Sequence, residues 1–200
     1  MDPRKYITIT NEKIIRLQAG AQGFRNAFFI IYNSIISKEG CESWFQDGDG
    51  MSVLGTNGCF SIELYLKFLM VISSFNNRTL SGTHIKGHSL DDLYKELNRK
   101  KSNYVLELED LYKQTKHKNS NNTLQDFLSG IHDHFTDWRY SYDSGTLNVN
   151  LNTLSDVLNL LEEYSNKKFL DVSSILAQHP VTQSDDQTMS IDDFNDIKKI

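Results

Sequence analysis

The segment CFSIELYLKFLMVISSF, from Cys59 to Phe75, decides the fold class. Apolar residues occupy almost every side of a helix drawn through it, and only Glu63 and Lys67, four residues apart, form a polar edge. A helix that is apolar almost all round is typical of the centre of a helical protein. Its most apolar stretch, residues 64–72, is too short to span a bilayer. The segment therefore predicts a buried central helix.

Amphipathic stretches before and after this segment supply the helices that would cover it. Each shows apolar residues at spacings of three and four, the period of one helix face. These stretches span residues 11–37, 89–97, 104–116, 123–142 and 151–164, and the segment KKFLDVSSILAQHP, residues 167–180, is expected to add a short further helix. The two prolines are Pro3 and Pro180, so no proline interrupts the chain between them. The sequence therefore predicts an all-α fold, a single bundle of five to six helices.

Residues 38–58, between the first and the central helix, are expected to form a long loop. They contain five of the 11 glycines and show no sustained period. Two other glycines, Gly20 and Gly23, lie inside the first predicted helix. Because glycine lowers helix propensity, we expect a neighbouring helix to pack closely there. The side chains expected in the core are Leu64, Phe68, Leu93, Leu128, Phe135 and Leu158.

The composition is that of a soluble globular protein, with 200 residues, 24% charged residues and a net charge of −5. This balance gives no global attraction to nucleic acid or to anionic membranes. Two cysteines, Cys41 and Cys59, are too few for a disulfide framework, and the first ten residues lack the apolar core of a signal peptide. We therefore expect a cytoplasmic chain with reduced thiols, no membrane contact and no cofactor.

The chain divides into a helical domain, residues 1–178, and a tail, residues 179–200. The tail is acidic and sparse in apolar residues, so we expect it to be mobile. Its apolar side chains Ile191 and Phe194 are expected to offer a contact to a protein partner.

No metal site is expected. His132 and His134 would point about 200° apart on a helix, so they cannot share one ion there. The segment DGDG, residues 47–50, lacks the remaining acidic ligands of a calcium loop.

Two predicted helices begin at recognisable capping residues. Ser89 and Thr123 each precede an amphipathic run, and each is followed three positions later by an aspartate. Gly87 and His88 stand directly before Ser89. A histidine at such a place most often hydrogen-bonds the backbone or packs under the bundle, and contact with a ligand is the alternative.

Three segments resemble the HEPN superfamily of small helical domains. They are SIELYLKFLMVISS, residues 61–74, then GHSLDDLYKEL, residues 87–97, and DHFTDWRYSYD, residues 133–143, which resembles a later helix of some members. The matched positions include Glu63 and Lys67 in the first segment and Gly87 and His88 in the second. The resemblance implies an HEPN-like helical bundle, frequent homodimers, and roles tied to RNA or nucleotides.

Catalytic members of this superfamily are, as the resemblance implies, metal-independent ribonucleases that use an arginine followed after four to six residues by a histidine. Histidine suits proton transfer at a 2′-hydroxyl near neutral pH, and arginine stabilises charge on the phosphate. Arg78 and His84 have this spacing, but they lie in the loop before His88. Arg139 lies in the expected later helix, yet no histidine follows it within this spacing, and His132 precedes it by seven residues.

We therefore expect a non-catalytic binding module, a homodimer that contacts RNA, a nucleotide or a protein partner. His88 and Arg139 are the predicted contacts and are expected to share one polar notch. The basic run NRKK, which contains Lys100 and Lys101, would add phosphate contacts if it faces the same side.

Two alternatives remain open. The first is a metal-independent endoribonuclease of a bacterial defence or toxin–antitoxin system, with Arg78, His84 and Arg139 as catalytic residues. The second is a structural dimerisation module that uses the apolar helices.

Overall fold

The computed structural model describes residues 11–37, 49–73, 87–115, 122–131 and 150–178. Six helices and no strand lie in these ranges: α1 (Asn11–Ser37), α3 (Asp49–Ser73), α4 (Leu90–Lys100), α5 (Ser102–Gln114), α6 (Leu124–Gly130) and α8 (Leu151–Gln178). The prediction of an all-α bundle of five to six helices is confirmed for this part of the chain.

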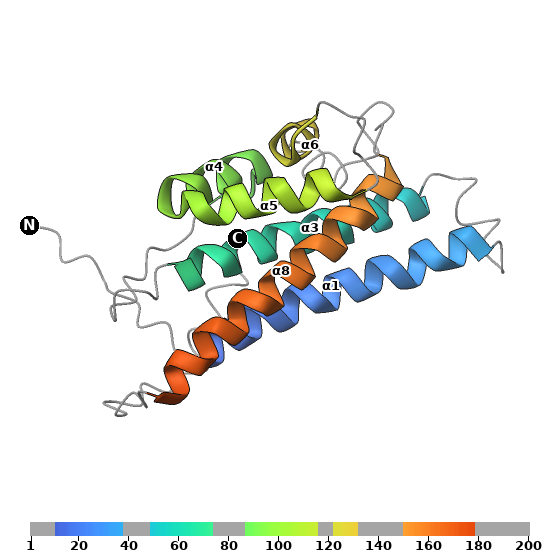
Figure 1. Ribbon diagram of the computed structural model, residues 1–200. Helices are drawn as coiled ribbons and strands as arrows, with labels where there is room; N and C mark the ends of the chain where they lie inside the picture. Colours follow the sequence, from blue (N-terminus) through green and yellow to red (C-terminus); the bar gives the residue numbers. More distant parts are fainter. Residues whose placement is uncertain (1–10, 38–48, 74–86, 116–121, 132–149, 179–200) are drawn as a thin grey trace, which may run out of the picture.

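Helix α3 is the central helix of the bundle. It packs against α1, α8 and α4. In Figure 1, α1 lies along one side of α3, the α4–α5 pair and α6 lie on the other, and α8 crosses in front. All residues from Tyr65 to Ser73 except Lys67 are buried, because apolar side chains surround this part of the helix. The predicted central position is therefore confirmed.

Most of the predicted core side chains are buried. Phe68, Leu93, Leu128 and Leu158 have exposed fractions of 3% or less. Leu64 is only partly buried and packs against the outside of the core, so the prediction of its full burial is wrong. It lies on the side of α3 that faces α1, where its Cδ1 is 3.4 Å from the place a Cβ would take on Gly20. Phe135 lies outside the described residues.

The start of α3 differs from the prediction. The helix begins at Asp49 instead of Cys59, so residues 49–58 are helical although they were expected in the loop. A Cβ on Gly58 would lie 2.9 Å from Cδ2 of Leu154 on α8 and 3.2 Å from Cδ2 of Phe28 on α1. Glycine therefore permits the close packing of three helices here, at a cost in helix propensity of about 1 kcal/mol.

The two glycines of α1 differ in how closely other residues approach them. A Cβ on Gly20 would be in ordinary contact with α3, whereas a Cβ on Gly23 would meet no atom within 4 Å. The predicted close approach is thus confirmed at Gly20 and wrong at Gly23.

Both predicted N-terminal caps are present. The Ser89 hydroxyl accepts a hydrogen bond from the backbone N–H of Asp92, at 3.2 Å. Thr123 and Asp126 form a reciprocal capping box, with side chain to backbone distances of 3.0 and 2.9 Å. Each cap satisfies backbone N–H groups that the first helical turn leaves without a partner.

Helix α6 is also stabilised by side chains of the neighbouring helices α4 and α5. The Glu109 carboxylate of α5 accepts hydrogen bonds from the backbone N–H groups of Leu124 and Gln125, at 2.9 and 3.1 Å, and from the Tyr94 hydroxyl of α4, at 3.0 Å. A second link joins the Ser129 hydroxyl to Asp91 at 2.8 Å. One carboxylate therefore connects α4, α5 and the start of α6.

The ends of the last two described helices differ from the prediction. Helix α6 ends at Gly130 with Ile131 as its C-cap, so the single helix expected to continue to residue 142 is interrupted there. Helix α8 continues to Gln178 and so includes most of residues 167–180, which were expected to form a separate short helix. Its extension is tied to α5 by Lys168, whose Nζ is 2.8 Å from Glu107 Oε2.

Helices α1 and α8 are joined by three polar side-chain pairs with a regular spacing. Gln18 donates to Asn166 at 2.7 Å, Arg25 donates to Asn159, and Tyr32 donates to Asn152 at 2.6 Å. The members on each helix are seven residues apart, two helical turns, and run in opposite directions. Arg25 also contacts the Glu162 carboxylate at 2.9 Å. We call these three pairs the polar ladder.

Among the described helices, none combines the length and the apolar character needed to cross a bilayer.

Candidate functional site

Three polar side chains from the first two matched segments meet at the edge of α3. Oε1 of Glu63 lies 2.6 Å from Nζ of Lys67, one turn along the same helix, and 3.0 Å from Nδ1 of His88, which precedes α4. We call Glu63, Lys67 and His88 the His88 cluster. It joins positions 25 residues apart in the sequence.

The local sequence explains how His88 reaches Glu63. Gly87 has a φ of 100°, a left-handed conformation that side chains rarely permit, so the chain turns sharply before His88. Ser89 follows immediately and is fixed as the N-cap of α4. The backbone of His88 is thus constrained on both sides, and its ring is directed at α3.

The three side chains differ strongly in burial. Glu63 is 2% exposed, the Lys67 side chain 16%, and the His88 side chain 65%. Among the described residues, no donor lies within hydrogen-bond distance of Glu63 Oε2, which is itself buried. One turn before Glu63, burial and then the Glu63 charge raise the pKa of the Cys59 thiol. This thiol is therefore a buried, unreactive group.

A buried carboxylate that holds an exposed imidazole can act in two ways. It restricts the ring to one orientation, which prepares the ring to contact a ligand. It can also orient the ring for proton transfer, as in enzymes where a carboxylate holds a histidine. Both roles require an accessible ring, and the imidazole of His88 is mostly exposed.

The sequence predicted the contact between Glu63 and Lys67 but not the contact between Glu63 and His88. The i, i+4 contact of Glu63 with Lys67 is present, but the carboxylate is buried within the bundle. His88 was expected to hydrogen-bond the backbone or to pack under the bundle. Its Nδ1 contacts the Glu63 side chain, and its ring is largely exposed, so it does not pack under the bundle.

The predicted phosphate contacts Lys100 and Lys101 lie at the other end of α4. An 11-residue helix is about 16 Å long, so these lysines are not brought to His88. Nζ of Lys100 is 3.6 Å from Glu96, and Nζ of Lys101 is 5.9 Å from the centre of the Tyr104 ring.

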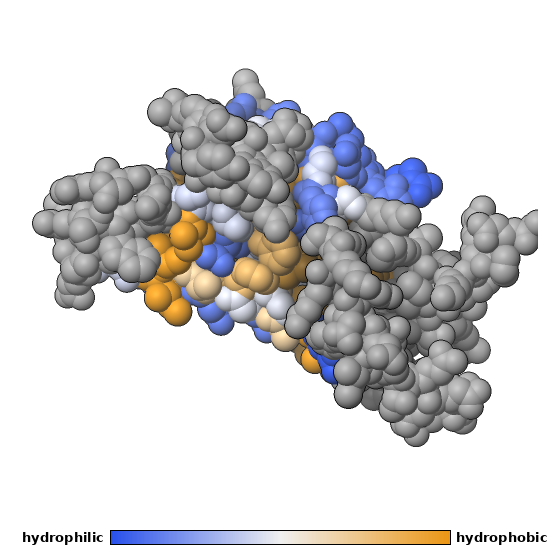
Figure 2. Space-filling view, turned by 180° about the vertical axis from the view of Figure 1, so that it is seen from behind, coloured by the Kyte–Doolittle hydropathy of each residue, from blue (hydrophilic) through white to orange (hydrophobic). Residues whose placement is uncertain are grey.

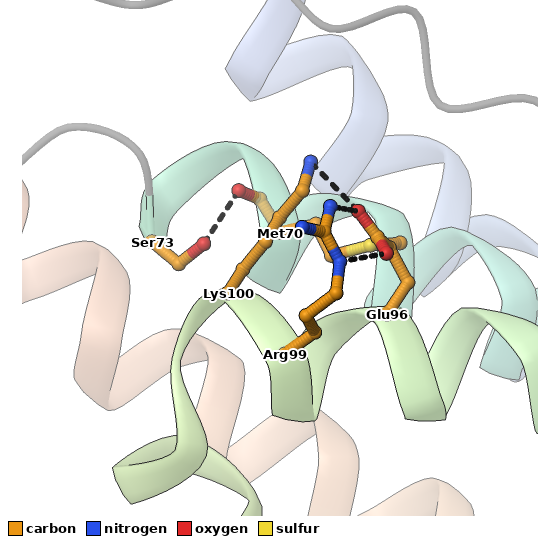
Figure 3. A network of polar contacts seen from close by, with 5 residues as sticks. All are labelled: Met70, Ser73, Glu96, Arg99 and Lys100. Atoms are coloured by element: carbon orange, nitrogen blue, oxygen red, sulfur yellow. Dashed lines mark hydrogen bonds and ion pairs between the residues drawn. The ribbon is translucent and has the colours of Figure 1, made fainter.

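Glu96 also binds Arg99, through two contacts of 2.8 and 2.7 Å. Figure 3 shows Arg99 and Lys100 converging on this one carboxylate above the end of α3, where the Ser73 hydroxyl donates to the Met70 carbonyl. The positive charge of the NRKK run is therefore partly neutralised within α4.

The other predicted site residues lie outside the described residues. These are Arg78 and His84, together with Arg139 and His132. The predicted notch between His88 and Arg139 accordingly stays a prediction. Within the described ranges, no group of three or more His, Cys, Asp or Glu side chains is placed to hold a metal ion.

Comparisons of the chain with protein-family models, with curated proteins and with solved structures gave no match.

Proposed function

We propose that the chain is an HEPN-like helical binding module that contacts RNA or a nucleotide through His88 and does not cleave it. The observation that carries this proposal is the His88 cluster itself. Glu63, Lys67 and His88, from the first two of the three segments that resemble HEPN domains, meet at the edge of α3.

The exposure of His88 favours a binding role over a purely structural one. A histidine that only fastens α4 to α3 could be buried with its carboxylate partner. Here the carboxylate is buried, but the ring is 65% exposed. Glu63 therefore holds a polar, aromatic group at the surface, where it can hydrogen-bond a ligand and stack on a base.

The charge distribution favours specific contacts over general attraction to phosphates. The net charge is −5, and Arg99 and Lys100 share the Glu96 carboxylate. Non-specific RNA binding depends on free basic side chains and falls steeply with salt. We therefore expect modest affinity that depends on His88 more than on ionic strength.

Fluorescence anisotropy with labelled single-stranded RNA and with a labelled ATP analogue tests the proposal. His88→Ala should weaken binding several-fold while the protein stays folded. Asn98→Ala is the matched control, because Asn98 is exposed on the same helix. If neither probe binds, or if both variants bind like the wild type, the proposal is wrong. Binding only to a protein would favour the partner alternative.

The carboxylate–imidazole contact also supports a second candidate, the metal-independent endoribonuclease. In that case His88 would transfer a proton, and Arg78, His84 or Arg139 would stabilise the phosphate. Incubation with RNA in EDTA distinguishes the two candidates. Specific cleavage that His88→Ala abolishes would favour the enzyme, and intact RNA with measurable binding would favour the module.

A further inference from the structure

We infer that Glu63 is a positioning residue that fixes the tautomer of His88, so that the neutral ring recognises a hydroxyl or amino group of the ligand. The tautomer is argued from the geometry alone. The ligand part rests on the proposed function.

Two contacts converge on the same oxygen of Glu63. The Lys67 ammonium can only donate, so Oε1 of Glu63 is the acceptor at 2.6 Å. His88 Nδ1 approaches this oxygen at 3.0 Å. An unprotonated Nδ1 would point its lone pair at a carboxylate oxygen. Nδ1 therefore carries the proton and donates it to Glu63.

Burial makes this arrangement hard to change. Glu63 is 2% exposed, and Lys67 holds it from one turn away. On the other side, Gly87 and Ser89 restrict the backbone of His88. A rotation of the ring would remove one of these two contacts at a buried carboxylate oxygen, which is costly in a folded protein.

The tautomer determines what the exposed ring can recognise. A neutral imidazole has one N–H, so a proton on Nδ1 leaves Nε2 as an acceptor. Phosphate oxygens are also acceptors and give the neutral ring no hydrogen bond. Hydroxyl and amino groups can donate to Nε2. On single-stranded RNA, the donor that DNA lacks is the ribose 2′-hydroxyl.

The tautomer can be read directly by long-range ¹H–¹⁵N NMR of His88. The spectrum should be recorded at alkaline pH, because only the neutral ring has two tautomers. We expect the wild type to show protonated Nδ1. A ring protonated mainly on Nε2 would overturn the inference without any variant being needed.

Two substitutions at Glu63 separate positioning from packing. Glu63→Gln keeps an acceptor oxygen, so His88 should keep the Nδ1–H form. Glu63→Met has a similar volume and no strong acceptor, so both tautomers should appear. If Glu63→Met fails to fold, the wild-type spectrum and Glu63→Gln still decide the question. An unchanged tautomer in folded Glu63→Met would contradict the positioning role.

The ligand part is tested with RNA and DNA oligonucleotides of one sequence. We expect the wild type to prefer RNA about fivefold, the contribution of one hydrogen bond, and His88→Ala and Glu63→Met to lose this preference. Equal affinity of the wild type for both strands would overturn the ligand part. If no RNA binds, the proposed function fails with it, while the NMR result still decides the role of Glu63.

Discussion

Gly58 is the position where one added carbon would disturb three helices. A Cβ there would lie 2.9 Å from Leu154 and 3.2 Å from Phe28. Gly58→Ala should therefore destabilise the protein by about 1–3 kcal/mol, as overpacking does, although alanine is the better helix former. The measurement is the free energy of unfolding from urea titration.

Gly23→Ala is the matched control for this prediction. Gly23 also lies within a helix, and a Cβ there would meet no atom within 4 Å. The substitution should stabilise the protein by about 0.5–1 kcal/mol, because alanine has the higher helix propensity. A similar loss of stability in both variants would show that packing is not the cause at Gly58.

Truncation of two α3 side chains should separate the centre of the core from its edge. Phe68 is fully buried, whereas Leu64 is partly buried. Phe68→Ala should cost about 3–5 kcal/mol, and Leu64→Ala less than that, since part of the leucine surface already meets water. Equal losses in urea titration would mean that Leu64 is as important to the core as Phe68.

The sequence predicted single residues well where the signal was local. The caps at Ser89 and Thr123 and the Glu63–Lys67 contact lie within four positions of their partners, so spacing alone indicates them. The contact between Glu63 and His88 joins α3 to the residues before α4, across 25 residues of sequence. No periodicity in either segment indicates that partner, and it became visible only in three dimensions.

At the scale of elements, the short helix α6 depends on a carboxylate that belongs to α5. Glu109 accepts two backbone N–H groups at the start of α6 and the Tyr94 hydroxyl. Glu109→Ala would leave these donors without an acceptor, so we expect a loss of about 1–3 kcal/mol. Hydrogen exchange should become faster at the amides of Leu124 and Gln125.

Asp110→Ala provides the control for Glu109→Ala. Asp110 is the next residue along α5 and is exposed. Its removal changes the charge of the helix by the same amount and should leave hydrogen exchange in α6 unchanged. Faster exchange in both variants would point to a general charge effect instead of a specific cap.

Errors in the predicted ends of helices show that sequence patterns do not reveal contacts with other helices. The start of α3 was missed because three glycines within residues 49–58 are typical of a loop. The glycine at 58 is explained by neighbours from α1 and α8, which the segment itself does not contain. The extension of α8 was underestimated for a similar reason, since Lys168 makes its contacts with α5.

At the scale of the whole molecule, hydrogen bonds lower the pKa values of several carboxyl groups, so these groups stabilise the fold at neutral pH. The Arg99 hydrogen bond lowers the pKa of Glu96. At Asp91 and Glu107, burial raises the pKa, but hydrogen bonds outweigh it, from Lys95 to Asp91 and from Lys168 to Glu107, so both pKa values lie below the usual range.

Acid should therefore destabilise the fold. A carboxyl whose pKa is lower in the folded than in the unfolded chain stabilises the fold above the unfolded pKa, about 4 for Asp and Glu. This contribution is lost as the pH falls through the folded pKa. The urea midpoint should decrease below about pH 4, and Asp91→Asn should make the decrease shallower. A midpoint that is constant down to pH 2 would contradict this account.

The predicted homodimer has apolar surface available for it. Ile30, Ile36 and Leu170 are at least 60% exposed, and Figure 2 shows hydrophobic residues reaching the surface on the face opposite to that of Figure 1. We expect sedimentation equilibrium at micromolar concentration to give twice the mass of one chain. A particle of single mass would favour a monomeric module.

The polar ladder between α1 and α8 does not by itself determine the position of α8 along its axis. All three members on α8 are asparagines, and Gln18, Arg25 and Tyr32 each donate to an asparagine oxygen. If α8 slid by seven residues, Asn159 would meet Gln18 in an equivalent pair. The ladder therefore sets the rotation of α8 about its axis but not its axial position. The contact of Arg25 with Glu162 has no such equivalent, because Ser155 and Phe169 stand seven residues on either side of Glu162, so this carboxylate specifies the axial position of α8.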